Sequence, residues 1–297
     1  MNIFVTGASG LIGRHLTPLL ESSGHALVRL VRGEPGDERE RRWDPGVQVL
    51  SPKSFEGADV VIHLAGENIG EGRWTEAKKR RIRESRVRGT GLIAEAIAGL
   101  AQPPQALVVA SAIGYYGDRG DELLTESSPP GAGFLPELCQ AWEQAADPAR
   151  ERGIRCTHIR TGMVLSRDGG ALAKMLLPFK LGAGGVMGSG RQYWSWISVD
   201  DAARMFQFAS ENEALFGPIN STAPNPVTNR EFTKTLGRVL KRPTIMPMPA
   251  FAARLGLGEM ADALILASAR VLPEVAQRHG FEFQYGDLEF ALRALLL

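Results

Sequence analysis

Three glycines at a constant spacing stand close to the amino terminus of this 297-residue sequence. The segment runs Thr6-Gly7-Ala8-Ser9-Gly10-Leu11-Ile12-Gly13, between an apolar run and an amphipathic stretch. In such a turn the first glycine permits the bend, the second lets the backbone approach a pyrophosphate, and the third brings helix against strand. The helix then directs unpaired amides and its positive dipole end at the diphosphate. We therefore expect a dinucleotide site formed by Gly7, Ser9, Gly10, Leu11, Ile12 and Gly13.

The residue that follows the second expected strand, at 26–31, bears on which dinucleotide is bound. NAD sites place Asp or Glu about 20 residues after the glycine turn, where it accepts hydrogen bonds from the ribose hydroxyls. Here Arg32 takes that place, with Arg29 nearby. A guanidinium can pair bidentately with a 2′-phosphate, so the sequence favours NADP. The alternative is a solvated arginine at a strand end, and Glu34 close by leaves that alternative open.

The other groups that could do chemistry indicate no second site. The five histidines show no metal-ligand spacing, and Cys139 and Cys156 form no Cys-x-x-Cys pair, so we expect neither a metal nor a disulfide framework. Eight basic residues lie between positions 73 and 88; a solvated helix face is favoured over a nucleic-acid surface. The glycine-rich loop at 182–190 lacks a Gly-Lys-Ser/Thr ending, and we interpret it as a mobile flap over substrate.

The elements that must position these groups alternate in type along the first half of the chain. Continuous apolar runs predict strands buried on both faces of a parallel sheet, at 3–6, 26–31, 60–65, 106–110 and 155–159. Helical spacing predicts helices at 11–20, 75–100, 134–152, 201–210, 229–240, 251–272 and 286–297. This pattern predicts an α/β fold: a Rossmann-type doubly wound domain over residues 1–165, to which some later segments return. A smaller, mainly helical C-terminal region over 166–297 would complete a cleft.

The composition is that of an ordinary folded chain, with 44% hydrophobic and 23% charged residues. The 34 Lys and Arg nearly balance the 33 Asp and Glu, so the net charge of +1 gives no general reason to bind nucleic acid or an anionic membrane. No apolar run approaches the roughly 20 residues of a membrane span. The first residues also lack a basic leader, and we expect a cytoplasmic protein.

Several further segments form a set together with the glycine turn. They are His63-Leu64-Ala65-Gly66-Glu67-Asn68-Ile69, Ser111 with Tyr115-Tyr116-Gly117, Trp142-Glu143, Gly169-Gly170-Ala171, Ser195-Trp196-Ile197-Ser198-Val199-Asp200-Asp201, Gly258-Glu259-Met260 and Gly280-Phe281. With these segments the chain resembles, nearly end to end, the extended short-chain dehydrogenase/reductases. More narrowly, it resembles the "epimerase family" proteins with an atypical active site, whose own terminal domain the last two segments resemble.

The resemblance implies which further residues contact the cofactor. Leu64, Ala65, Gly66 and Glu67 would line its adenosine or nicotinamide side. Ser85-Arg86 matches a Ser-Arg pair of the subfamily, with Arg86 facing the cofactor, and Met163 would lie near the nicotinamide. Ligands of doubly wound sheets lie at the carboxyl ends of the strands, which agrees with these positions. The alternative for residues 63–65 is a buried strand end without a ligand.

The catalytic pattern of the family is broken in this chain. Active short-chain reductases use a Ser or Thr, a Tyr, and a Lys four residues after the Tyr, whose cation lowers the tyrosine pKa. The four positions that follow the tyrosines at this spacing hold Arg119, Gly120, Ile197 and Glu289. With Glu143 set on the helix of the family, Leu135 and Cys139 occupy the places of Tyr and Lys. The usual proton-transfer pair is therefore absent.

Three residues remain as catalytic candidates. We expect Ser111 to polarise a carbonyl or hydroxyl group while Tyr115 or Tyr116 supplies the proton. The alternative is that the two tyrosines merely pack over the nicotinamide. The sequence thus predicts an NADP(H)-dependent oxidoreductase or epimerase with an unidentified small-molecule substrate, or else a non-catalytic NADP(H)-binding sensor. A homodimer through two helices of each subunit is implied by the resemblance alone.

Overall fold

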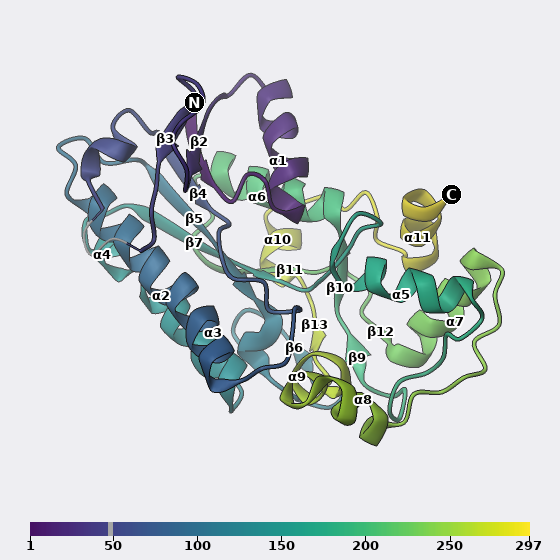
Figure 1. The fold of residues 1–297 in the computed structure, drawn as a ribbon. Coiled ribbons are helices and arrows are strands. Elements are labelled where there is room, and N and C mark those ends of the chain that lie inside the picture. The colour runs from purple at the N-terminus through teal and green to yellow at the C-terminus, as the bar shows by residue number, and fades with distance from the viewer. Residues whose placement is uncertain (47–49) are drawn as a thin grey trace.

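A seven-stranded parallel sheet forms the centre of the computed structural model, which describes residues 1–46 and 50–297 (Figure 1). The strand order is β11-β7-β5-β4-β1-β2-β3. The bounds are β1 (Asn2–Thr6), β2 (Ala26–Val31), β3 (Glu40–Arg42), β4 (Val60–His63), β5 (Ala106–Ala112), β7 (Arg155–Thr161) and β11 (Gly217–Ser221). Every neighbouring pair is parallel. The predicted Rossmann-type α/β fold is confirmed.

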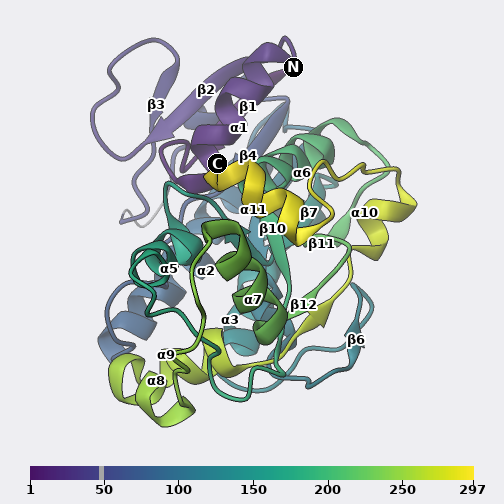
Figure 2. The same cartoon turned by 90° about the vertical axis from the view of Figure 1, so that its right-hand side faces the viewer.

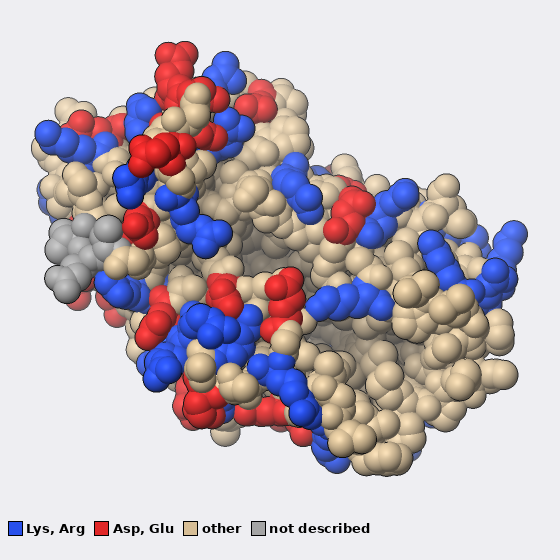
Figure 3. All heavy atoms as spheres, viewed as in Figure 1, with Lys and Arg blue, Asp and Glu red and all other residues tan. Residues whose placement is uncertain are grey.

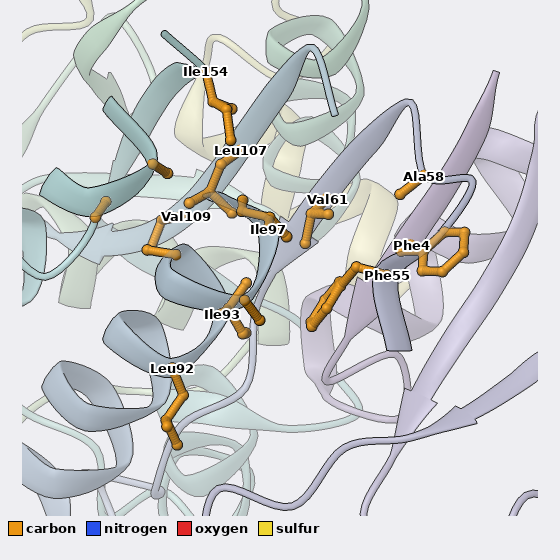
Figure 4. Packing of buried hydrophobic residues seen from close by; sticks show 14 of the residues in the cluster. Phe4, Phe55, Ala58, Val61, Leu92, Ile93, Ile97, Leu107, Val109 and Ile154 are labelled. Atoms are coloured by element: carbon orange, nitrogen blue, oxygen red, sulfur yellow. The ribbon is translucent and has the colours of Figure 1, made fainter. Parts of the chain in front are cut away.

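Helices cover both faces of this sheet. One face carries α2 (Glu76–Ala98), α3 (Phe134–Gln144) and α4 (Asp147–Glu151), and the other carries α1 (Leu11–Ser22), α6 (Val199–Glu211) and α10 (Glu274–Arg278). On the first face, Ile93 and Ile97 of α2 pack on Val61, Leu107 and Val109 of the strands (Figure 4). Burial of each such side chain contributes about 1.5–3 kcal/mol, so the two cores hold the strand ends in place.

A separate core lies in the C-terminal region. It contains α5 (Gly170–Lys180), α7 (Asn229–Leu240) and α11 (Leu288–Leu296), which pack around Trp196 and Phe232; α7 and α11 lie side by side in Figure 2. The remaining elements are α8 (Ala250–Leu257), α9 (Glu259–Ala261), η1 (Pro52–Phe55), η2 (Ile113–Tyr116), η3 (Asp262–Leu266), β6 (Leu123–Leu124) with β13 (Arg270–Val271), β8 (Met163–Leu165) with β10 (Trp196–Ser198), and β9 (Tyr193–Trp194) with β12 (Val227–Thr228). Within the described residues no helix has the length and apolar character needed to cross a bilayer.

Two predicted helices are wrong in extent. The stretch 134–152 is divided into α3 and α4, because the first helix ends before residues 145–146 and the second starts at Asp147, with Pro148 in its first turn. The stretch 251–272 is interrupted at Gly258, whose φ of +62° ends α8, and its last residues form β13. Several elements of the second half were not expected, among them α5, α10 and β11. β11 pairs with β7 at the edge of the seven-stranded sheet, so a segment of the second half of the chain belongs to the sheet of the Rossmann-type domain.

Candidate functional site

The predicted glycine turn lies between β1 and α1. Gly7 has a φ of +70°, and a Cβ there would lie 2.8 Å from the backbone nitrogen of Ala65, so no side chain fits. A Cβ on Gly13 would lie 2.3 Å from the carbonyl oxygen of Gly7, which shows how closely α1 packs on the turn. Helix α1 starts after Gly10 without a side-chain cap. Its first amides are therefore left for a ligand or water.

A cavity of about 870 Å³ opens at the carboxyl ends of β1, β2 and β4. It lies beside the place where the strand order reverses, between β1 and β4, which is the usual ligand position in doubly wound sheets. Figure 3 shows that this side of the molecule is hollowed near its centre, with charged side chains around the hollow. The predicted residues that line the cavity are Gly7, Ser9, Gly10, Arg32, Leu64, Ala65, Gly66 and Glu67. Three distant segments thus meet in one site, and their contact with a cofactor stays a prediction.

Arg32 differs from Arg29 and Arg42, which are both held in ion pairs. Within the described part of the chain, its exposed guanidinium makes no hydrogen bond or ion pair. Arg29 is held between Asp37 and Glu40, at 3.1 and 3.2 Å. Glu34, which left the alternative open in the sequence, pairs instead with Arg42 at 2.9 Å. Within the described residues, Arg32 and Arg14 are therefore the two arginines of this cavity wall whose guanidinium groups have no partner.

Glu67 brings a carboxylate to the same wall. Lys78 donates to it at 2.8 Å, with Arg81 at 3.5 Å, and the hydrogen bond from Lys78 holds the pKa of Glu67 below its usual value. The backbone amide of Glu67 donates to the hydroxyl of Ser85. Glu67 thus stays ionised and fixed in place.

Five predicted cofactor residues do not line the cavity. Leu11, Ile12 and Gly13 form the first turn of α1 behind the glycine turn, and Met163 begins β8. Arg86 is not among the residues that line the cavity, and the contact with the cofactor that the resemblance implied stays a prediction. Its Nη1 donates to the carbonyl oxygen of Glu67 at 3.0 Å, and its guanidinium lies 5.0 Å from the Trp142 ring. Burial lowers the pKa of Arg86. Its hydrogen bond to Glu67 holds the backbone of residues 66–67 in place.

Ser111 is held at the carboxyl end of β5 by a buried ion pair. Its Oγ donates to Oε1 of Glu143 at 2.7 Å. Arg160, opposite Ser111 in the register of β5 and β7, binds both oxygens of Glu143 with two bonds of 2.8 Å. A carboxylate cannot donate, so the single proton of Ser111 is committed to Glu143. What Ser111 has left for a ligand is an acceptor.

The two candidate tyrosines occupy different environments. Tyr116 is fully buried, accepts a hydrogen bond from Arg160 at 3.1 Å and donates to Asn220 at 2.7 Å. Burial raises the pKa of Tyr116 to about 12. Its hydroxyl therefore cannot reach a substrate, which removes it as the proton donor. Tyr115 is partly exposed, and the guanidinium of Arg160 lies 3.4 Å from its ring centroid.

The residues at the expected Tyr and Lys positions lie beside the same strand end. The side chain of Leu135 is 3.3 Å from the Cβ position of Gly114, and the thiol of Cys139 donates to the carbonyl oxygen of Ala112. Burial raises the pKa of the Cys139 thiol to about 12, so it is not a thiolate near neutral pH. Neither side chain can carry a proton in the place of the Tyr-Lys pair.

Sequence reasoning assigned no role to Glu143 or Arg160. Glu143 and Tyr115 also line a second cavity of about 470 Å³, between α3, α4 and β11. The available signal was Arg160 itself, a charged residue inside an otherwise buried strand, which requires a partner. Arg14 and Trp43 were likewise not expected in the first cavity. Among the described residues, no group of three or more His, Cys, Asp or Glu is arranged to hold a metal ion.

Comparison with known proteins places this geometry in a family. The model of the NAD dependent epimerase/dehydratase family matches residues 3–220, and a domain of unknown function (DUF1731) matches residues 248–295. Epimerase family protein YfhF of Bacillus subtilis is 42% identical over 302 residues, covering 100% of this chain and 98% of that protein. Epimerase family protein MT2273 of Mycobacterium tuberculosis is 41% identical, covering 98% of this chain and 96% of its own.

Solved structures agree with this assignment. The crystal structure of human epimerase family protein SDR39U1 (isoform 2) with NADPH has a TM-score of 0.89 at 34% identity, and the match covers 99% of both chains. The Thermus thermophilus UDP-glucose 4-epimerase complex with NAD, at 19% identity and a TM-score of 0.76, shares the fold. It covers 99% of this chain and 97% of that one. The chain belongs to the NAD-dependent epimerase/dehydratase family.

Proposed function

We propose that this chain binds NADP(H) in the 870 Å³ cavity and acts as an oxidoreductase or epimerase on a small molecule that carries a hydroxyl or carbonyl group. The observation that carries the proposal is the joint position of the glycine turn and Arg32 on one cavity wall. Gly7 packs against the backbone of Ala65 too closely for any Cβ, and the turn lines the cavity in which a diphosphate would meet the start of α1. The human relative solved with NADPH supports the same choice of dinucleotide.

Recognition of the 2′-phosphate is assigned to Arg32. A phosphate that binds there gains a charge-assisted contact without displacing an existing ion pair, since Arg32 has none within the described residues. Arg29, bound to Asp37 and Glu40, is far less available. Helix α1 and the backbone of the glycine turn would hold the diphosphate.

The nicotinamide ring, when bound, supplies or accepts the hydride. Ser111 can only accept a hydrogen bond from a ligand, because its proton is held by Glu143. It therefore suits the alcohol form of a substrate, whose O–H it would orient. Tyr115 is the remaining candidate for proton transfer, since the hydroxyl of Tyr116 is engaged with Arg160 and Asn220.

A specific observation favours a second candidate function. The chain lacks the Tyr-x-x-x-Lys pair, and buried Leu135 and Cys139 lie near the end of β5 instead. A non-catalytic protein that senses NADP(H) would need the dinucleotide cavity and no proton donor. The two functions share cofactor binding and differ in turnover.

Calorimetry with NADPH and NADH tests the shared step. Arg32→Gln should weaken NADPH binding about 10- to 100-fold and leave NADH binding unchanged, because only the 2′-phosphate contact is lost. Arg42→Gln is the matched control, since Arg42 pairs with Glu34 and does not line the cavity. An unchanged preference for NADPH in Arg32→Gln, or no binding of either dinucleotide by the wild type, would contradict the proposal.

Turnover separates the two candidates. The wild type is incubated with NADPH and a panel of carbonyl compounds and sugar nucleotides while the absorbance of the reduced ring is followed. If the wild type and Tyr116→Phe oxidise NADPH and Tyr115→Phe does not, the result supports an enzyme. Tight binding without consumption across the panel supports the sensor.

A further inference from the structure

One surface of the C-terminal region is both apolar and basic. It is formed by the end of α5 and by the segment that connects α7 to α8, which lie together. Nε of Arg242 donates to the carbonyl oxygen of Lys180 at 2.8 Å, and the amide N–H of Met248 donates to the carbonyl oxygen of Val186 at 2.9 Å. We define the apolar-basic face by its exposed residues Lys180, Leu181, Lys241, Ile245, Phe251 and Leu255.

The apolar members of this face project into solvent. The exposed fractions are 74% for Leu181, 76% for Ile245, 72% for Phe251 and 78% for Leu255. Side chains that line a pocket keep much of their surface covered, whereas these four are mostly uncovered. Several large apolar side chains grouped on one exposed surface indicate an interaction site.

Basic residues predominate around them, although Arg254 pairs with Asp262 and Arg238 with Glu289, each at 2.9 Å. Residues 169–190 and 232–258 contain seven Lys and Arg and no Asp or Glu. Within the described residues, the side chains of Lys180 and Lys241 have no hydrogen-bond or ion-pair partner. In Figure 3 the part of the surface over α5 and the α7–α8 connection is tan and blue, without red. This local excess contrasts with the chain as a whole, whose net charge is +1.

We propose that the apolar-basic face docks onto the surface of a membrane that contains anionic phospholipids. Leu181, Ile245, Phe251 and Leu255 would enter the boundary between headgroups and acyl chains, and Lys180 and Lys241 would contact the phosphates. A second copy of this chain fits less well, because a symmetric dimer through this face would set the lysines of one copy against those of the other. The charge is complementary to an anionic bilayer.

Vesicle sedimentation tests the proposal with the full chain. Vesicles of phosphatidylcholine alone are compared with vesicles that also contain phosphatidylserine, at low and high salt. We expect binding to the anionic vesicles only, decreasing with salt. Lys180→Gln and Lys241→Gln should each lower the partition coefficient about fivefold. Leu181→Ser combined with Phe251→Ser should lower it at least tenfold.

Two control variants keep the result specific. Phe216→Ser removes a phenylalanine of similar exposure (77%, against 72% for Phe251) outside the face, and Arg80→Gln removes an exposed charge on α2; both should sediment like the wild type. All variants should keep the wild-type affinity for NADPH and the wild-type melting temperature. Failure of the wild type to bind anionic vesicles, or equal binding by the Leu181/Phe251 variant, would overturn the proposal. So would dimerisation that these same variants abolish without any vesicle binding.

Discussion

Glu143 determines what Ser111 and Arg160 can do. Its carboxylate accepts a hydrogen bond from the hydroxyl of Ser111 and two hydrogen bonds from the guanidinium of Arg160. Because Arg160 is 3% exposed, its charge depends on this partner for compensation. The same arginine touches Tyr115 and Tyr116, so one ion pair organises the end of β5.

Removal of the Glu143 charge should therefore be costly. We expect Glu143→Gln to lower the free energy of unfolding by about 3–5 kcal/mol, since it leaves Arg160 buried without a counter-charge. Glu137→Gln, an exposed position on the same helix, is the control and should change it by less than about 0.5 kcal/mol. Denaturant unfolding measures both. Equal stabilities of the two variants would show that the pair contributes little.

A comparison of Gly7 with Gly24 distinguishes the effect of a positive φ from the effect of close backbone packing. Both Gly7 and Gly24 have a positive φ, but only Gly7 has backbone atoms within 4 Å of its Cβ position. Gly24→Ala should cost about 1 kcal/mol of stability and leave NADPH binding intact. Gly7→Ala should in addition weaken NADPH binding more than tenfold, because the turn must move away from Ala65. Calorimetry on both variants checks this, and wild-type affinity in Gly7→Ala would contradict it.

At the scale of elements, helix bounds were predictable where local signals mark them. Helix α7 has the predicted bounds, because Thr228 caps it and Glu231 completes a capping box. The break at 145–146, by contrast, lies in a run of alanines without a glycine or proline at the break itself. The short strand β11 was missed because its sequence, Gly-Pro-Ile-Asn-Ser, lacks an apolar run.

The cap of α7 can be tested on its own. Thr228→Ala should lower the free energy of unfolding by about 1 kcal/mol, because the amide of Glu231 loses its side-chain acceptor. NADPH binding should not change, since α7 lies outside the cavity. Thermal and denaturant unfolding provide the measurement. A loss of less than about 0.3 kcal/mol would mean that packing on α11 alone holds the helix.

At the scale of the whole molecule, two buried histidines link stability to pH. Burial lowers the pKa of His63 to about 3 and that of His158 to about 4, against 6.5 for an ordinary histidine. The unfolded chain therefore binds protons below about pH 6.5 that the folded chain does not. With respect to these two groups, the free energy of unfolding is therefore highest above about pH 6.5, and it decreases as the pH falls toward 4.

We expect the free energy of unfolding to fall by up to about 1.4 kcal/mol per pH unit for each histidine across this window. His63→Gln should reduce the slope by up to one proton, at some cost in stability, because the hydrogen bond with Thr6 changes. Unfolding in urea at several pH values between 4 and 7 measures the slope. A wild-type stability that is flat across the window would contradict the assignment of both groups.

The parallel sheet and the glycine turn could both be predicted from the amino-acid sequence. Both follow from local features: apolar runs long enough for buried strands, and glycines whose spacing suits one turn between β1 and α1. It also identified Arg32, since the distance from the glycine turn is set along the chain. Its whole-chain charge, however, concealed the local excess of Lys and Arg on the apolar-basic face.

The hydrogen-bond and ion-pair partners of the site residues, in contrast, depend on the tertiary structure. Ser111, Glu143 and Arg160 come from three elements and meet through the register of β5 with β7 and the packing of α3. Arg29 and Arg32 stand three residues apart, yet in the described part of the chain the fold pairs the first with two carboxylates and gives the second no partner. Spacing along a chain fixes local turns, whereas the pairing of charges depends on which distant segments the folded cores bring together.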